Sequence, residues 1–168
     1  MNTMSLAAII AISHLNTRQA TIRMLRGYRN QQWKAEHGKE RIDVIQSRLE
    51  SVTAKIGGEH VSGGGGNHAE DALVAGIDQK AMAEYGYLWA TAYISLMDTC
   101  LSRLTDQERR VLELRFIDYL EGNGVNRVMD EYHVSRSEVY RMTDDAVDKL
   151  ASLIYPWAYA NPGKNPGK

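Results

Sequence analysis

The sequence of 168 residues has no proline before Pro156 and a single cysteine, Cys100. Without proline, nothing in the first 155 residues forbids long helices. A lone cysteine cannot form a disulfide within the chain, which suits a reducing compartment. The longest apolar stretch, Leu6–Ile12, is much shorter than the ~20 residues of a membrane-spanning helix, and it lacks the flanks of a signal peptide. We therefore expect a cytoplasmic protein with no membrane partner.

The sequence also lacks the patterns of common catalytic and metal sites. The glycine run at 63–66 is not followed by the Lys-Ser/Thr pair of a phosphate-binding loop, so we interpret it as a linker. No paired catalytic constellation stands out. Five histidines show no metal-ligand spacing: His14, His37, His60, His68 and His133. The sequence predicts no cofactor, no metal site and no enzymatic activity.

Charge is unevenly distributed along a chain whose formal net charge is −1. Residues 1–60 carry a net +4, residues 61–103 a net −3, and residues 104–150 a net −4. Any affinity for nucleic acid must therefore come from individually placed arginines rather than from a broad basic face. Four arginines of the first expected helix are candidates for phosphate contacts or for a merely solvated face: Arg18, Arg23, Arg26 and Arg29.

Apolar spacing predicts an all-α chain, because no strand-like alternation of useful length occurs. We expect an N-terminal helical segment at 1–38 that breaks near Gly38, and a helical hairpin at 39–103 with a glycine-rich linker at 57–67. A helix-turn-helix domain at 104–155 and a flexible tail at 156–168 complete the predicted organisation.

Both helices of the expected hairpin carry apolar residues at alternating spacings of 3 and 4. These are Ile42, Ile45, Leu49, Val52 and Ile56 in one helix, and Met82, Tyr85, Trp89, Ala92 and Leu96 in the other. The spacing fits a coiled-coil element between subunits and an intramolecular hairpin equally well. A neighbouring stripe of Tyr93, Met97 and Cys100 must also be buried, either by a second subunit or by the C-terminal module of the same chain. We expect a homodimer whose interface contains Tyr85, Trp89, Tyr93, Leu96 and Met97.

The C-terminal segment has the local signals of a helix-turn-helix. Thr105 and Glu108 form a capping-box pattern at the start of its first helix. A short helix at 125–132 is followed by His133, which tolerates the left-handed conformation that such a turn requires. Ser135 then caps a longer helix that keeps Val139, Met142, Ala146 and Leu150 inside.

The first turns of that longer helix are the predicted DNA-reading surface. Arginine binds the O6 and N7 atoms of guanine, and serine or tyrosine reaches phosphates or bases. Arg136, Ser137, Tyr140 and Arg141 share the outward face, with Ser135, Glu138, Arg127 and Arg115 as further candidates. The alternative from periodicity alone is an ordinary three-helix corner with solvated charges.

The segments LTDQERRVLELRF (104–116) and VMDEYHVSRSEVYRMTDDAVDKL (128–150) resemble region 4 of sigma-70-type factors. A broader resemblance covers most of the chain. The arrangement of its segments is similar to that of small sigma-like, late-gene regulators of phages and prophages of Gram-positive bacteria. These segments are LRGYRN (25–30), RIDVIQSRLESVTAKIGG (41–58), a glycine linker and the region-4-like C-terminal segment. The resemblance implies duplex DNA and host RNA polymerase as partners, in a bacterial host cell. Met129, His133 and Glu138 depart from the usual region-4 residues, so a base preference does not transfer.

Two classes of function, besides a plain interaction module, fit these features. The first is a sequence-specific transcriptional regulator that acts with host polymerase. It would assist rather than replace a sigma factor, because residues 1–103 show no promoter-melting domain. The alternative is a DNA-packaging component that resembles a small terminase subunit. A dimer favours regulation, and a ring of many subunits favours packaging.

Overall fold

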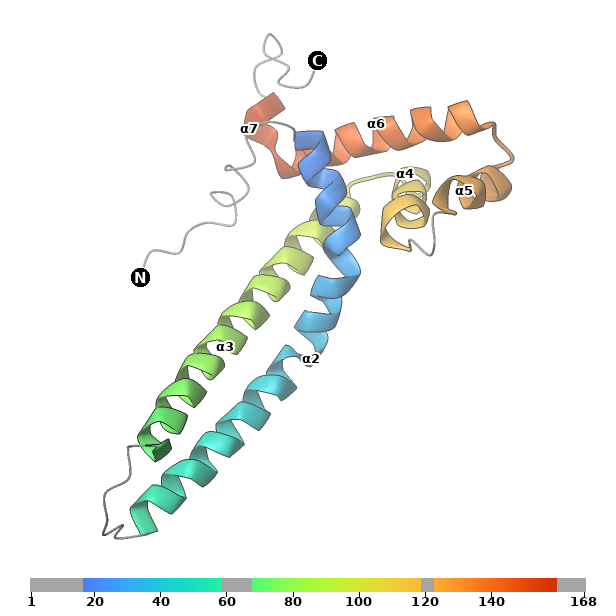
Figure 1. The fold of residues 1–168 in the computed structure, drawn as a ribbon. Coiled ribbons are helices and arrows are strands. Elements are labelled where there is room, and N and C mark those ends of the chain that lie inside the picture. The colour runs from blue at the N-terminus through green and yellow to red at the C-terminus, as the bar shows by residue number, and fades with distance from the viewer. Residues whose placement is uncertain (1–16, 59–67, 119–122, 160–168) are drawn as a thin grey trace. The chain divides into compact units, whose positions relative to one another are not determined.

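The computed structural model describes residues 17–58, 68–118 and 123–159 (Figure 1). Its helices are α2 (Thr17–Gly58), α3 (His68–Leu101), α4 (Asp106–Leu112), η1 (Glu113–Ile117), α5 (Gly124–Tyr132), α6 (Arg136–Ile154) and α7 (Pro156–Tyr159). No strand occurs in these described ranges, and the predicted all-α class is confirmed. Residues 1–16, most of the predicted linker (59–67) and the end of the predicted tail (160–168) lie outside the described residues.

Packing divides the chain into two compact units. The hairpin unit is Gln31–Thr91, and the core unit consists of the described parts of Met1–Asn30 and Ala92–Lys168. The division therefore falls inside α2 and inside α3, and not at residues 38 and 103 as the sequence predicted. The reason is that both long helices contribute one end to the hydrophobic cluster of the C-terminal helices.

In the hairpin unit, α2 and α3 run antiparallel and pack at two glycines (Figure 1). A Cβ built on Gly38 would lie 2.6 Å from Cδ2 of Tyr87, and one on Gly76 would lie 2.5 Å from Cδ2 of Leu49. A larger residue at Gly38 would therefore push Tyr87 and its helix away, whereas at Gly76 a rotation of the Leu49 side chain could relieve the contact. The predicted break at Gly38 is wrong, because α2 continues through it. A glycine inside a helix costs about 1 kcal/mol relative to alanine, and at Gly38 it leaves room for the ring of Tyr87.

The inward side of α3 is not the one that the sequence predicted. Met82 and Tyr85 of the expected stripe are 75% and 63% exposed. The buried and half-buried residues of the inner side lie three, four or seven positions apart, namely Leu73, Gly76, Ala83, Tyr87 and Ala90. The spacing alone could not choose between the sides, because α3 has apolar residues on both. On α2 the prediction holds, with Ile45 buried and Ile42, Leu49 and Val52 half-buried.

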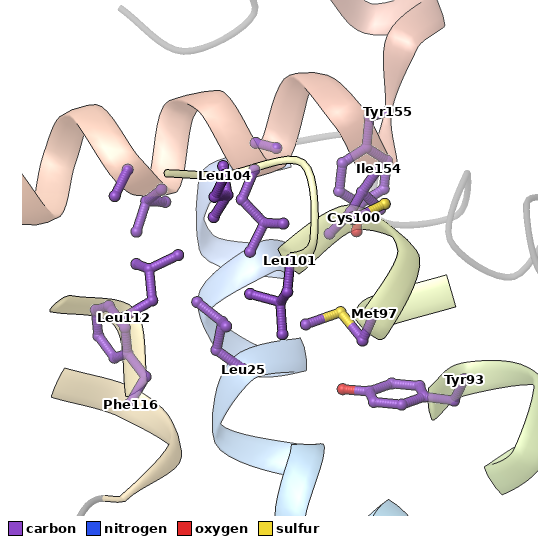
Figure 2. Packing of buried hydrophobic residues seen from close by; sticks show 14 residues of the cluster. Leu25, Tyr93, Met97, Cys100, Leu101, Leu104, Leu112, Phe116, Ile154 and Tyr155 are labelled. Carbon is purple, nitrogen blue, oxygen red and sulfur yellow. The ribbon is translucent and has the colours of Figure 1, made fainter. Parts of the chain in front are cut away.

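The core unit is organised around one large hydrophobic cluster (Figure 2). Leu25 of α2, Met97 of α3 and Leu150 of α6 are each fully buried in it. Leu112 of α4 and Phe116 of η1 close the cluster from the side of the helix-turn-helix. The helix-turn-helix therefore packs against the first turns of α2 and the last turns of α3.

The stripe of Tyr93, Met97 and Cys100 is covered within the chain. Tyr93 is 7% exposed and Met97 fully buried, and both belong to the cluster that α6 completes. The hydroxyl of Tyr93 also donates a hydrogen bond to the carbonyl oxygen of Met24. The expectation that a second subunit covers Tyr93 and Met97 is thus replaced by the alternative, in which the C-terminal module packs back in cis. Leu96 is half-buried against the same cluster.

None of the described helices combines the length and the apolarity that crossing a membrane requires. The predicted tail begins with a helical turn, α7, whose Tyr159 packs against the core cluster. Its hydroxyl also shares a hydrogen bond of 3.2 Å with Oγ1 of Thr17. The part of the tail that the structure describes is therefore attached to the core unit.

Candidate nucleic-acid interface

A complete capping box begins the first helix of the helix-turn-helix, as the sequence predicted. The hydroxyl of Thr105 accepts a hydrogen bond of 3.2 Å from the backbone N–H of Glu108. The carboxylate of Glu108 accepts one of 2.8 Å from the backbone N–H of Thr105. The carboxylate also binds Nζ of Lys149 on α6 at 2.7 Å. This contact joins the start of α4 to the far part of the recognition helix.

The turn between α5 and α6 has the predicted geometry. His133 is in the left-handed region, with φ 54° and ψ 42°, and ends α5. Val134 then packs against a small cluster of Val111, Leu114, Val128 and Val139. Ser135 accepts a hydrogen bond of 3.3 Å from the backbone N–H of Glu138 and begins α6. The turn therefore fixes the direction of α6 relative to α5, as a recognition helix requires.

The start of α6 presents the predicted polar side chains to solvent. Arg136, Ser137, Tyr140 and Arg141 are all exposed, and Val139 on the opposite side is fully buried. Among the described residues, none forms an ion pair or a hydrogen bond with Arg136. Its guanidinium is therefore available to an external acceptor. The hydroxyl of Ser137 shares a hydrogen bond of 2.9 Å with that of Ser135.

Arg141 differs from Arg136 because it already has an acidic partner. Glu138 accepts hydrogen bonds from its Nε at 3.0 Å and its Nη2 at 2.5 Å. These hydrogen bonds lower the pKa of Glu138, so the carboxylate is charged at neutral pH. Asp145 adds a longer ion pair of 3.9 Å. Of the two arginines at the start of α6, Arg136 is thus the one whose charge has no acidic partner among the described residues.

Arg115 lies beside the recognition helix for a reason that the sequence analysis missed. Residues Glu113–Ile117 form a π-helical stretch, in which the backbone N–H of Asp118 donates to the carbonyl oxygen of Glu113 at 2.7 Å. This wider turn directs Leu114 into the small cluster and Phe116 into the large one, with Arg115 between them. A signal was present, since apolar residues at 111, 112, 114 and 116 cannot share one face of a regular α-helix.

The guanidinium of Arg115 is held by two aromatic rings. Its Cζ lies 5.5 Å from the ring centroid of Phe116 and 5.4 Å from that of Tyr140. Such cation–π contacts contribute about 0.5–2 kcal/mol. They connect η1 to the exposed side of α6. The structure therefore brings Arg115 together with Tyr140, two of the predicted DNA-contacting residues.

Three of the remaining predicted residues, Arg127, Arg29 and Arg18, have partners within the chain. Arg127 of α5 donates from Nη1 to the carbonyl oxygen of Asp118 at 2.8 Å, which braces the end of η1. The carboxylate of Asp118 binds Arg29 of α2. Arg18, another α2 arginine, forms ion pairs with Asp144 and Asp148 of α6. Of the four α2 arginines, Arg18 and Arg29 are thus engaged within the chain, whereas Arg23 and Arg26 are exposed without an acidic partner among the described residues.

Residues 100–152 match the family described as sigma-70, region 4. This confirms the resemblance for the C-terminal module, a helix-turn-helix of the kind that binds DNA. The match begins at the last turns of α3 and ends within α6, so α2 and the hairpin unit lie outside it. No curated protein and no solved structure matches the chain. The region-4 family is a DNA-binding family and not an enzymatic one, and nothing found supports the terminase alternative.

Proposed function

We propose that this chain is a sequence-specific regulator of transcription, of phage or prophage type, that acts with host RNA polymerase in the bacterial cytoplasm. The base-reading surface is the first two turns of α6, with Arg136 as the main base-contacting side chain and Ser137, Tyr140 and Arg141 beside it. The observation that carries this proposal is a capped recognition helix whose leading arginine is exposed and has no partner among the described residues. The region-4 match of the same segment supports it.

The charge of the module supports base reading over general attraction to DNA. Residues 104–150 have a net charge of −4, and acids such as Asp144, Asp145 and Asp148 follow the first turns of α6. A surface of this kind gains little from unspecific phosphate attraction. Its affinity for DNA must depend on a few directed contacts. A bidentate arginine–guanine contact is worth about 1–3 kcal/mol of discrimination.

The proposal is tested by selecting duplexes from random DNA with the full-length protein and sequencing them. A recovered consensus is expected, and Arg136→Ala should weaken binding to it by about 1–3 kcal/mol while leaving binding to a scrambled duplex nearly unchanged. The matched control is Arg103→Ala, which also removes an exposed positive charge, before α4. Selection without a consensus, or equal losses for both variants, would contradict the proposal.

We also propose that the regulator is a homodimer that pairs through α3. The outer side of α3 exposes Val74, Ile77, Tyr85 and Leu88, each more than half exposed, with Met82 and the half-buried Trp89 beside them. Val74 to Leu88 is a stripe of about 21 Å at the helical rise of 1.5 Å per residue. Because none of these four side chains is charged, a second copy of the chain, related by a two-fold axis, can cover the stripe with the same stripe of its own α3. Two copies on adjacent half-sites would multiply the few contacts of one module.

A further inference from the structure

Arg26 of α2 and Arg115 of η1 converge on one aromatic ring in the core unit. Cζ of Arg26 lies 5.9 Å from the ring centroid of Phe116, and Cζ of Arg115 lies 5.5 Å from it. Phe116 itself is only 6% exposed and anchors η1 in the large cluster. Two side chains of the same charge, 89 positions apart in the sequence, are therefore brought to the same place by the fold.

The two guanidinium groups lack a counter-ion among the described residues. Arg26 is exposed and makes no ion pair there. Arg115 makes neither an ion pair nor a hydrogen bond with a described residue, and its buried Nε has no partner. The acid that acts on Arg115 is Asp144, which already pairs with Arg18. Burial lowers the pKa of Arg115, Tyr140 opposes this shift, and the charge of Arg26 adds to it. An anion placed between the two groups would relieve their repulsion.

We propose that Arg26 and Arg115 together bind one backbone phosphate of the DNA duplex, so that α2 is part of the DNA-binding surface. This inference rests on the function proposed above and adds a helix that lies outside the region-4 match. The ring of Tyr140 links the pair to the recognition helix, because it contacts Arg115 and is itself 47% exposed on the base-reading side of α6. A phosphate bound next to Tyr140 would therefore lie beside the surface on which Arg136 and Ser137 are exposed.

Duplex DNA is the occupant that the surroundings favour over a free anion. The site is a shallow surface pair with one exposed arginine, which by itself would hold inorganic phosphate weakly. Binding becomes strong when the phosphate is delivered by a duplex that the recognition helix holds at the same time. A phosphate contact fixes the register of the protein on DNA and carries no base information. The pair should thus affect affinity and salt dependence, and leave base preference unchanged.

The test measures affinity by fluorescence anisotropy at several salt concentrations, on a duplex selected by the full-length protein and on a scrambled one. Arg26→Ala should reduce the slope of log affinity against log salt by about 0.9 on both duplexes. The ratio of wild-type to variant affinity should then fall about 3-fold between 50 and 200 mM salt. Arg26→Lys, which keeps the charge, should restore most of the slope. Arg23→Ala, which removes an exposed α2 arginine one turn earlier, is the matched control and should change the slope less.

A double-mutant cycle decides whether the two arginines share one phosphate. If they do, Arg26→Ala and Arg115→Ala together cost less than the sum of their single effects. Single methylphosphonate substitutions in the duplex should also reveal one position that weakens the wild type but not Arg26→Ala. Thermal melting of each variant separates lost binding from lost packing on Phe116.

The outcomes separate this inference from the proposed function. A wild type that binds the selected duplex, with Arg26→Ala and Arg23→Ala equal in slope, would overturn the phosphate site alone. Additive losses in the cycle would overturn the sharing of one phosphate. Full competition by millimolar inorganic phosphate at constant ionic strength would make the site a free-anion site instead. A wild type that binds no duplex would overturn both proposals.

Discussion

Glu138 holds the guanidinium of Arg141 through two hydrogen bonds on the exposed side of α6. A negative charge therefore lies inside the surface that would face DNA. The carboxylate repels phosphate and occupies two of the donors that Arg141 would use on a guanine. We infer that Glu138 lowers the affinity of the module for DNA of any sequence, while it fixes the direction of Arg141.

Replacing Glu138 by glutamine should raise the affinity for a scrambled duplex and make its salt dependence steeper. The released Arg141 can then contact a phosphate, which adds about 0.9 to the slope of log affinity against log salt. Discrimination between the selected and the scrambled duplex should fall, since the gain is independent of sequence. Anisotropy titrations at three or more salt concentrations measure both quantities.

Asp130→Asn is the control for Glu138→Gln, because Asp130 is an exposed acid on α5 and the net charge changes equally. Its effect should be the smaller one. Equal effects of the two variants would mean that net charge alone is responsible, and that the hydrogen bonds to Arg141 have no part in it.

Local signals in the sequence are sufficient to predict the geometry of the helix-turn-helix. The capping residues Thr105 and Ser135 and the left-handed His133 each act within a few positions of the chain, so their geometry could be predicted before any packing was known. The exposed position of Arg136 followed from the buried position of Val139 on the same helix. These features depend on short-range chemistry, which a sequence records directly.

Features that depend on contacts between distant segments could not be predicted in the same way. On the inner side of α3, Gly76 and Tyr87 lie against Leu49 and Gly38 of α2, whereas apolar residues occur on both sides of that helix. The position of Arg115 depends on a π-helical turn and on Tyr140 of another helix. The sequence allows either a second subunit or the C-terminal module to cover Met97, and the assembled cluster shows that the C-terminal module does so.

Gly124→Ala should destabilise the core unit, although alanine is the better helix former. A Cβ at this position would lie 2.7 Å from the carbonyl oxygen of Leu114 and 3.1 Å from Cα of Arg115. Both atoms belong to the backbone of η1, so a rotamer change cannot relieve the clash. We expect a loss of about 1–3 kcal/mol in the free energy of unfolding, measured by urea denaturation.

Gly86→Ala tests the same substitution at a position where the added methyl group causes no steric clash. A Cβ on Gly86, inside α3, would meet no atom within 4 Å. This variant should gain about 0.5–1 kcal/mol from helix propensity and reduced freedom of the unfolded chain. If both variants changed stability in the same direction, the close approach of Gly124 to η1 would not be the controlling factor.

Leu88→Glu should separate the proposed dimer into monomers without loss of helicity. Leu88 is 65% exposed in the single chain, so a charge there costs little in the monomer and much in an apolar interface. Light scattering should give twice the chain mass of 18.9 kDa for the wild type and the single mass for the variant. Gln79→Glu adds a charge at another exposed position of α3 and should leave the dimer intact.

Met97→Glu provides a contrast, because Met97 is fully buried in the core unit. This variant should lose helical signal or melt at a much lower temperature, whatever its oligomeric state. A wild type that scatters as a monomer at micromolar concentration, with and without its selected duplex, would contradict the α3 dimer. A folded Met97→Glu monomer would instead show that the interface uses the residues first expected, Tyr93 and Met97.

The contact between Glu108 and Lys149 should make stability depend on pH in the acid range. Burial alone would raise the pKa of Glu108, but the hydrogen bonds from Lys149 and Thr105 outweigh it and the net pKa is lowered. A carboxyl whose pKa is lower in the folded state stabilises fully above its unfolded pKa of about 4.3. The contribution is lost as the pH falls through the folded pKa. Both side chains are partly exposed, 26% and 43%, so we expect only about 0.2–1 kcal/mol.

Glu108→Gln isolates the charge, since glutamine keeps the capping-box hydrogen bond to the backbone of Thr105. Urea unfolding of the wild type, Glu108→Gln, Lys149→Met and the double variant gives a coupling free energy at each pH. The coupling should be constant from neutral pH down to about 5 and should then fall as the pH drops through the lowered pKa of folded Glu108, because a protonated Glu108 no longer attracts Lys149. A coupling that persists unchanged at the lowest pH would assign the contact to packing of the lysine stem rather than to charge.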